Sequence, residues 1–159
     1  MNDTAQVHHH DTRELARKLN AYPTPLLNIT NLKKRWHCSR SAVDRFRKEF
    51  GLRSDGPEDG HPLFDLLSVL KLEDVSDPLL AWVLGTADDR KVLAADPLTI
   101  DDLVLLDRSI GGHDPETFRR RARAGKQPGF KIGRQWLFRP SIEDLERLEE
   151  IRKASEADQ

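Results

Sequence analysis

The 159-residue chain contains one cysteine, one methionine and one tyrosine, and only 6% of its residues are aromatic. Because Cys38 is the single cysteine, no disulfide can form within the chain, which is typical of a protein in a reducing compartment. No apolar run approaches the ~20 residues that a membrane-spanning helix needs. The first residues also lack the basic start and apolar stretch of a signal peptide. We therefore expect a cytoplasmic protein with no membrane partner.

Residue sets that carry catalysis or bind cofactors are also missing. The acidic pairs Asp88-Asp89 and Asp101-Asp102 are not accompanied by a nucleophile or by converging bases, and there is no glycine-rich loop for a nucleotide. His37 and Cys38 lack a second pair at the spacing of a zinc site. The sequence therefore predicts a protein that is not an enzyme and that has neither a cofactor nor a metal site.

Charged residues, in contrast, are abundant, and they are segregated along the chain although the net charge is only −1. Residues 31–53 carry eight Lys or Arg against two acids, and residues 113–139 have the same numbers, so each block has a charge of +6. Residues 54–112 sum to −9 and residues 140–159 to −4. Because both basic blocks coincide with predicted helices, the pattern favours two polyanion-binding surfaces over two ordinary solvated helices.

The clearest local pattern lies in residues 97–151. Thr99 and Asp102 have the spacing of a capping box before an apolar helix. Gly111-Gly112 permits a tight turn with positive φ, and Asp114-Pro115 is a typical start for a second helix. This second helix is rich in arginine. The sequence therefore predicts a helix-turn-helix whose second helix is basic.

A predicted hairpin follows the basic helix. Residues 130–138 alternate around Gly133-Arg134, as two strands joined by a tight turn do. Phe130 and Trp136 fall on positions expected to pack in the core of this hairpin and not to stack on bases. Ser141 then caps a last helix. A holding helix, a basic helix and a basic hairpin are the parts of a winged DNA-binding module.

A weaker copy of the pattern precedes it in residues 27–64. Asn28 and Ser39 are placed as helix caps and Gly51 as a helix stop, but the loop at residues 53–62 is acidic where a basic hairpin would be expected. We therefore expect an internal repeat whose first copy has a degenerate wing. The two copies align Leu27 with Leu98, Ile29 with Ile100, Leu32 with Leu103, Ser39 with Asp114, Val43 with Phe118, Arg45 with Arg120, Gly51 with Gly125 and Phe64 with Phe138.

Between the copies, Asp77-Pro78 starts an apolar helical run. Burial of this run within the chain is the simpler expectation; the alternative is a homodimer or higher oligomer formed through residues 78–93. The expected fold is mainly α with a small β-hairpin wing, as two tandem winged helix-turn-helix domains. The expected boundaries are 1–24 for an N-terminal arm with a short helix, 25–72 for the first domain, 73–96 for a helical apolar linker, 97–151 for the second domain and 152–159 for a disordered tail.

The second copy resembles the excisionase/MerR-type winged helix. Its helix Thr117-Phe118-Arg119-Arg120-Arg121 and its wing Phe130-Lys131-Ile132-Gly133-Arg134-Gln135-Trp136-Leu137-Phe138 are similar to the S-x-x-T-[VIF]-x-R-[WF] and F-K-[IVL]-G-[RG]-x-W-x-[FI] motifs of that family. The likeness covers residues 98–145, with the weaker copy at 27–72. It departs from the family at Gly111-Gly112-His113, and upstream it lacks the wing motif.

The resemblance implies that the second helix lies in the major groove and that the wing reaches phosphates or the adjacent minor groove. Arg120 and Arg119 are the leading candidates for base contact, with Arg40, Arg45 or Ser41 upstream. The complete expected DNA-binding set is Ser39, Arg40, Ser41, Asp44, Arg45, Lys48, Pro115, Glu116, Arg119, Arg120, Arg123, Lys126, Lys131 and Arg134.

The sequence therefore predicts a sequence-specific double-stranded-DNA-binding protein. Its expected role is that of a transcription regulator or an excisionase-like recombination directionality factor of a phage or mobile element. In the latter role an integrase or another mobile-element protein would be a partner. Two alternatives remain open: a DNA-packaging protein similar to a small terminase subunit, and an adaptor whose helix-turn-helix folds bind a partner protein.

Overall fold

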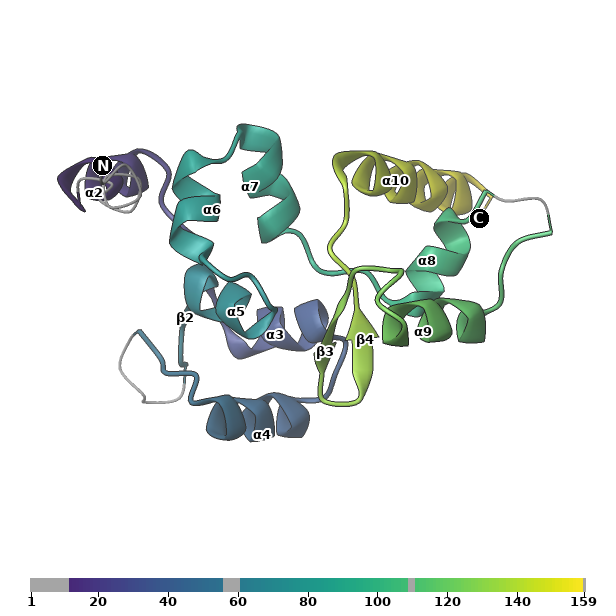
Figure 1. Cartoon of the computed structure of the whole chain (residues 1–159), viewed down its shortest axis with the longest axis horizontal. Coiled ribbons are helices and arrows are strands. Elements are labelled where there is room, and N and C mark those ends of the chain that lie inside the picture. The colour runs from purple at the N-terminus through teal and green to yellow at the C-terminus, as the bar shows by residue number, and fades with distance from the viewer. Residues whose placement is uncertain (1–11, 56–60, 109–110, 159) are drawn as a thin grey trace, which may run out of the picture.

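The computed structural model describes residues 12–55, 61–108 and 111–158 (Figure 1). Residues 1–11 of the predicted arm (1–24), the middle of the acidic loop and Ile110 lie outside the described residues. Described helices are α2 (Thr12–Ala21), α3 (Ile29–Trp36), α4 (Arg40–Phe50), α5 (Leu66–Leu72), α6 (Pro78–Leu84), α7 (Ala87–Ala94), α8 (Ile100–Leu106), α9 (Pro115–Arg123) and α10 (Ile142–Ala157).

Two small antiparallel sheets accompany these helices. β1 (Leu26–Leu27) pairs with β2 (Phe64–Asp65), and β3 (Phe130–Ile132) pairs with β4 (Gln135–Leu137). The expectation of a mainly α protein with a small β-hairpin is therefore confirmed. In the described part of the chain, no helix is both long enough and apolar enough to cross a bilayer.

The helix starts follow from local capping chemistry. Thr99 and Asp102 form the expected capping box, in which each side chain accepts a hydrogen bond from the other residue's backbone N–H. Ser39 and Asp114 cap α4 and α9 as expected. Gly51 ends α4 with a φ of 67°, a left-handed conformation that glycine adopts without strain. Short-range sequence signals thus place the starts of α4, α8 and α9 and the end of α4 correctly.

The strands that frame each helix pair show the same correspondence as the sequence alignment. Leu27 pairs with Phe64 in the N-terminal half. In the C-terminal half, Leu98 forms an isolated bridge with Phe138, with N–H···O distances of 2.7 and 2.8 Å between their backbones. In each half, a short extended segment therefore precedes the helix pair. It pairs with a second extended segment, which leads into the next helix.

The hairpin β3–β4 joins the two halves. Side chains on one of its faces, Phe130, Ile132 and Leu137, belong to a core cluster with residues of α3, α4 and β2. Trp136 is on the opposite face, because neighbouring strand residues alternate, and it packs against the core of the C-terminal half. The hairpin therefore lies between the two halves, at the centre of Figure 1, and Lys131 and the turn remain exposed.

A buried ion-pair network around Glu73 ties the same elements together. Its carboxylate accepts hydrogen bonds from Nε and Nη2 of Arg35 at 2.8 Å and from the indole N–H of Trp36 at 2.8 Å. Arg139, directly after β4 and Phe138, donates to it at 3.0 Å. Arg35 also donates to the carbonyls of Leu93, Ala94 and Ala95, which end α7. All five N–H groups of this guanidinium are thereby satisfied although the residue is only 1% exposed.

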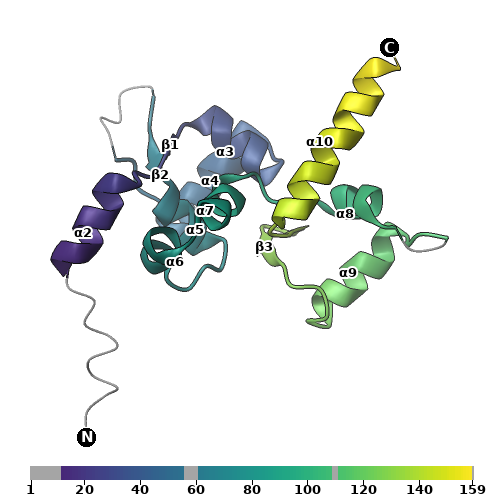
Figure 2. The same cartoon turned by 90° about the horizontal axis from the view of Figure 1, so that it is seen from above.

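Residues 73–96, expected to form a helical linker, form α6 and α7. Trp82 and Val83 are buried in a third cluster with Leu66 and Leu70 of α5, and α2 packs against the same cluster. The Trp82 indole also donates to the carbonyl of Tyr22 at 2.7 Å. Much of the apolar run is thus buried within the chain. Figure 2 shows α2 at the opposite end of the molecule from α10, which projects away from the hairpin.

The expected disordered tail at residues 152–159 is wrong for residues 152–157, because helix α10 continues to Ala157. Glu149 and Arg152 form an ion pair within this helix, which has good helix formers and neither Gly nor Pro. At the end of α4, Phe50 is 43% exposed and packs on Phe46, and Arg47 lies 4.8 Å from the centre of the Phe64 ring.

The close packing of the hairpin turn on α4 predicts that an alanine at Gly133 lowers the stability of the protein more than an alanine at Gly125. Gly133 and Gly125 both have positive φ, at 63° and 72°. An added Cβ at Gly133 would lie 2.8 Å from Cζ of the buried Phe46 ring, whereas one at Gly125 would have nothing within 4 Å. Gly133→Ala should therefore destabilise the protein by about 1–3 kcal/mol more than Gly125→Ala, the control with the same backbone strain. Urea unfolding measures the stability of both variants. Equal losses of unfolding free energy would contradict the packing of the hairpin on α4.

The Glu73 network predicts a second effect. Glu73→Gln leaves the buried Arg35 charge without its counter-ion and should cost about 3–5 kcal/mol of unfolding free energy at neutral pH. Glu149→Gln, which removes a solvated carboxylate from α10, is the control and should change stability little. A loss from Glu73→Gln no larger than the control's would show that the network is dispensable.

The pH dependence of that cost follows from the Glu73 pKa. Burial raises the pKa of this carboxyl, but hydrogen bonds from Arg35 and Trp36 and the charges of Arg35 and Arg139 outweigh it, so the pKa lies below its ordinary value. Ionised Glu73 therefore stabilises the fold fully above the unfolded-state pKa of about 4.3, and this contribution is lost as pH falls through the folded-state pKa. The stability gap between wild type and Glu73→Gln should narrow below pH 4 in urea titrations, about where the free carboxyl protonates.

Candidate nucleic-acid interface

Helix α4 presents the expected residues of the first copy. Ser39 accepts a hydrogen bond from the Ala42 N–H at 3.2 Å, and its hydroxyl lies 3.1 Å from that of Ser41. Val43 and Phe46 are buried, which turns the opposite side of the helix to solvent. Asp44 is half-buried and lies 3.6 Å from Arg47. The exposed members of the expected set on this helix and its cap are Ser39, Arg40, Ser41, Arg45 and Lys48.

Helix α9 is positioned in the same way. Asp114 accepts hydrogen bonds from the backbone and hydroxyl of Thr117 at 2.8 and 2.7 Å, which lower the pKa of its carboxyl. Phe118 and Ala122 are buried and anchor the helix. Arg121 is turned inward, where it lies over the Phe118 ring and 3.2 Å from His113. The exposed members of the expected set on this helix are Glu116, Arg119, Arg120 and Arg123, with Pro115 half-buried.

Glu116 restrains two of these arginines. Its carboxylate lies 2.7 Å from the Arg123 guanidinium and 3.5 Å from that of Arg119. The hydrogen bond from Arg123 is the main cause that lowers the pKa of Glu116. Arg120, on the outward side of α9, has no carboxylate within ion-pair distance among the residues that the structure describes. Arg120 is therefore the α9 arginine most available to a ligand.

The hairpin carries two more exposed cations, Lys131 in β3 and Arg134 in the turn. Lys131 and Arg134 are solvent-exposed while their neighbours Phe130 and Ile132 are buried. The Lys131 ammonium lies 5.2 Å from the centre of the Trp136 ring, an arrangement that holds the side chain against the hairpin. Trp136 is half-buried and Phe130 is 5% exposed, so both pack as the sequence predicted.

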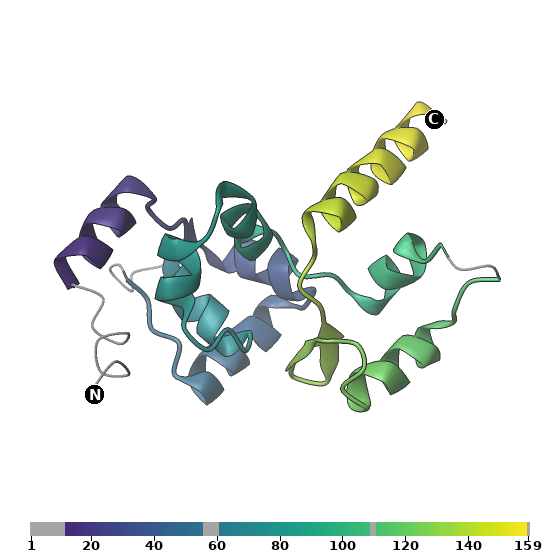
Figure 3. The ribbon, with the colours of Figure 1, turned by 45° about the horizontal axis from the view of Figure 1, so that its top comes forward.

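The elements that carry these cations lie along one edge of the molecule. Figures 1 and 3 show α4, the hairpin turn and α9 along the lower edge in both views, with α6, α7 and α10 above them. A hollow lined by Arg119, Arg123, Arg134, His37 and Trp136 joins α9 to the hairpin turn; Asp101 and Asp102 also line it. We use the term basic edge for the exposed cations Arg40, Arg45, Lys48, Arg119, Arg120, Arg123, Lys126, Lys131 and Arg134.

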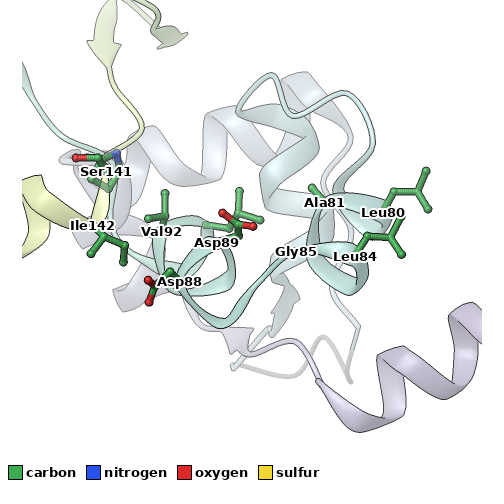
Figure 4. Close-up of a pocket in the computed structure, with 11 residues that line it drawn as sticks. Leu80, Ala81, Leu84, Gly85, Asp88, Asp89, Val92, Ser141 and Ile142 are labelled. Atoms are coloured by element: carbon green, nitrogen blue, oxygen red, sulfur yellow. The ribbon is translucent and has the colours of Figure 1, made fainter.

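The opposite edge has the opposite charge. Asp88 and Asp89 are exposed at the start of α7, and α10 adds exposed glutamates. Between α6, α7 and the start of α10 lies a largely apolar hollow lined by residues that include Leu80, Leu84 and Ile142 (Figure 4). Leu84 is 48% exposed, so the apolar run is not completely covered within the chain.

Not every base of the two charged blocks belongs to the basic edge. Arg35 and Arg139 were counted among the candidate polyanion-binding charges, but both are engaged by Glu73. Sequence reasoning missed this because Glu73 lies 38 and 66 residues away from its partners in the chain. No spacing rule links such positions. The expected site residues are otherwise exposed or half-buried on the two helices and the hairpin.

Comparisons with protein-family models, with curated proteins and with solved structures found no match for this chain. Among the residues that the structure describes, no group of three or more His, Cys, Asp or Glu is gathered in a way that would hold a metal ion. The chemistry of the basic edge is thus that of guanidinium and ammonium groups presented by two capped helices and a turn, which suits a polyanion.

The Glu116 ion pairs predict a charge effect specific to this edge. Glu116→Gln should raise the salt concentration at which the protein elutes from a heparin column, because it frees Arg119 and Arg123 and removes a repelling carboxylate. Glu143→Gln on α10 removes the same charge from the opposite edge and is the matched control. An equal shift in both variants would show that the position of the charge does not matter.

Proposed function

We propose that this protein binds double-stranded DNA through two helix-turn-helix units, α3–α4 and α8–α9, with β3–β4 as a shared wing. One observation carries the proposal. The apolar face of the hairpin is buried against α3 and α4, while its basic turn stays exposed between α4 and α9. Two basic helices and a basic turn are thereby held on one edge, opposite an acidic one.

The geometry of each unit supports this function. The first helix of each pair carries buried apolar residues, and the second is capped and turns its exposed side to solvent. Such a second helix is the one that enters the major groove in helix-turn-helix proteins. The two copies present Arg45 and Arg120 at corresponding positions, and both are exposed. The resemblance of residues 98–145 to the excisionase/MerR-type winged helix favours the same function.

The chemistry of arginine explains how such an edge would act. A guanidinium that pairs with guanine O6 and N7 contributes roughly 1–3 kcal/mol of discrimination between bases. One that pairs with phosphate contributes affinity that falls with salt but carries no sequence preference. Arg120 and Arg45 are assigned to base contact, and Lys131 and Arg134 on the hairpin to the backbone or the minor groove.

The segregation of charge favours DNA binding over a role as a protein-binding adaptor. An adaptor does not require its cations to gather on one edge with the acids on the other, whereas this arrangement orients the basic edge toward a polyanion. The proposed role is that of a transcription regulator or an excisionase-like recombination directionality factor, since both use this mode of DNA binding.

Fluorescence-anisotropy titration tests the proposal. Duplex DNA from the region around the protein's own gene and a scrambled duplex are titrated at ~50 and ~200 mM salt. Wild type should prefer the native duplex, and Arg45→Ala and Arg120→Ala should each weaken that binding about tenfold or more, in keeping with 1–3 kcal/mol for a base contact. Both complexes should weaken at the higher salt.

Arg152→Ala is the control, because it removes an exposed arginine from α10 on the opposite edge. It should leave duplex binding unchanged. Absence of binding to either duplex at the lower salt would refute the proposal. Equal losses from Arg152→Ala and Arg120→Ala would show that net charge and not the basic edge determines binding.

A further inference from the structure

The two helix pairs, α3–α4 and α8–α9, are packed together through the hairpin and are not separated by an exposed linker. The hairpin contributes one face to the core of α3 and α4 and the other to the core of the C-terminal half. The Gly133 backbone is packed so closely on Phe46 that a Cβ there would lie 2.8 Å from the ring. Phe46 itself is 5% exposed, so its ring is confined.

A second, independent connection crosses the same junction. Arg139, which follows β4, reaches Glu73 at 3.0 Å, and Arg35 of α3 fills the other side of that carboxylate. Arg139 also lies 5.1 Å from the centre of the Phe130 ring. Relative rotation of the two units would therefore separate a buried carboxylate from one of its counter-ions, which protein interiors strongly disfavour.

The position of the hairpin determines what lies between the two helices. Arg45 of α4 has its guanidinium 5.2 Å from the centre of the Phe46 ring, against which the Gly133 turn packs. On the other side, Arg134 of the same turn lines one hollow with Arg119 and Arg123 of α9. The cations thus follow one another from α4 through the turn to α9 without an intervening flexible segment.

From this arrangement we infer that the ligand is one composite duplex site, with two base-read segments at a single fixed spacing and a segment under the hairpin turn between them. The inference rests on the proposed DNA binding and goes beyond it, because two modules on a flexible linker would accept many spacings. One inserted base pair moves a half-site by about 3.4 Å and turns it by about 35° around the duplex axis. A rigid reader cannot follow that rotation.

Selection from a pool of duplexes with about 20 random base pairs, long enough for half-sites one helical turn apart, identifies the site. The full-length protein is used. The selected duplexes should contain two sequence blocks at one spacing. Arg45→Ala should abolish the preference for one block and Arg120→Ala the preference for the other.

The selected duplex is then resynthesised with one, two or about ten base pairs inserted between the blocks, ten being one helical turn. Each insertion should weaken binding about tenfold or more, the effect of losing the base contacts of one helix. The full-turn insertion should not restore affinity, because a rigid body cannot reach a half-site roughly 34 Å further away. Affinities that change less than threefold across the series would overturn the inference.

The outcomes separate this inference from the proposed function. No binding to any duplex refutes both. Selected duplexes with a single block, or with two blocks at variable spacing, leave DNA binding standing and overturn the fixed spacing. Selection without any sequence preference would overturn it as well, since a composite site requires two base-read segments.

Discussion

The arrangement of this protein depends on the ion pairs and hydrogen bonds of the buried Glu73 carboxylate. This carboxylate binds Arg35 and Trp36 of α3 on one side and Arg139, beyond the hairpin, on the other. Arg35 in turn caps the end of α7. A buried ion pair contributes little net stability compared with apolar packing, but a missing partner is costly. Its main consequence is therefore geometric: three segments far apart in the sequence must meet at one point.

In the proposed DNA complex, the hairpin β3–β4 at this junction places its exposed turn between the two basic helices. In a module that stands alone, a wing needs only one buried face. Here both faces contribute to a core: Phe130, Ile132 and Leu137 complete that of the N-terminal half, and Trp136 packs against that of the C-terminal half. The loop at residues 53–62 of the N-terminal half is acidic in sequence. The exposed turn with Arg134 lies between the two basic helices.

Much of the local structure could be predicted from the sequence because its causes are local. Capping boxes such as Thr99 with Asp102 and the alternation in residues 130–138 act over a few residues. The candidate site was predictable for the same reason, since exposure of Arg45 and Arg120 follows from helical periodicity. The role of Arg35 was not, because its partner Glu73 is distant in the chain.

By itself the sequence determined the two helix pairs, the hairpin and the side of each helix that carries charge, because short-range hydrogen bonding and side-chain period specify them. Only the tertiary structure decided which cations remain available and which half the hairpin packs against. It also decided that α4, the turn and α9 share one edge (Figure 3). These features depend on long-range packing and on pairing of buried charges, for which sequence spacing contains no rule.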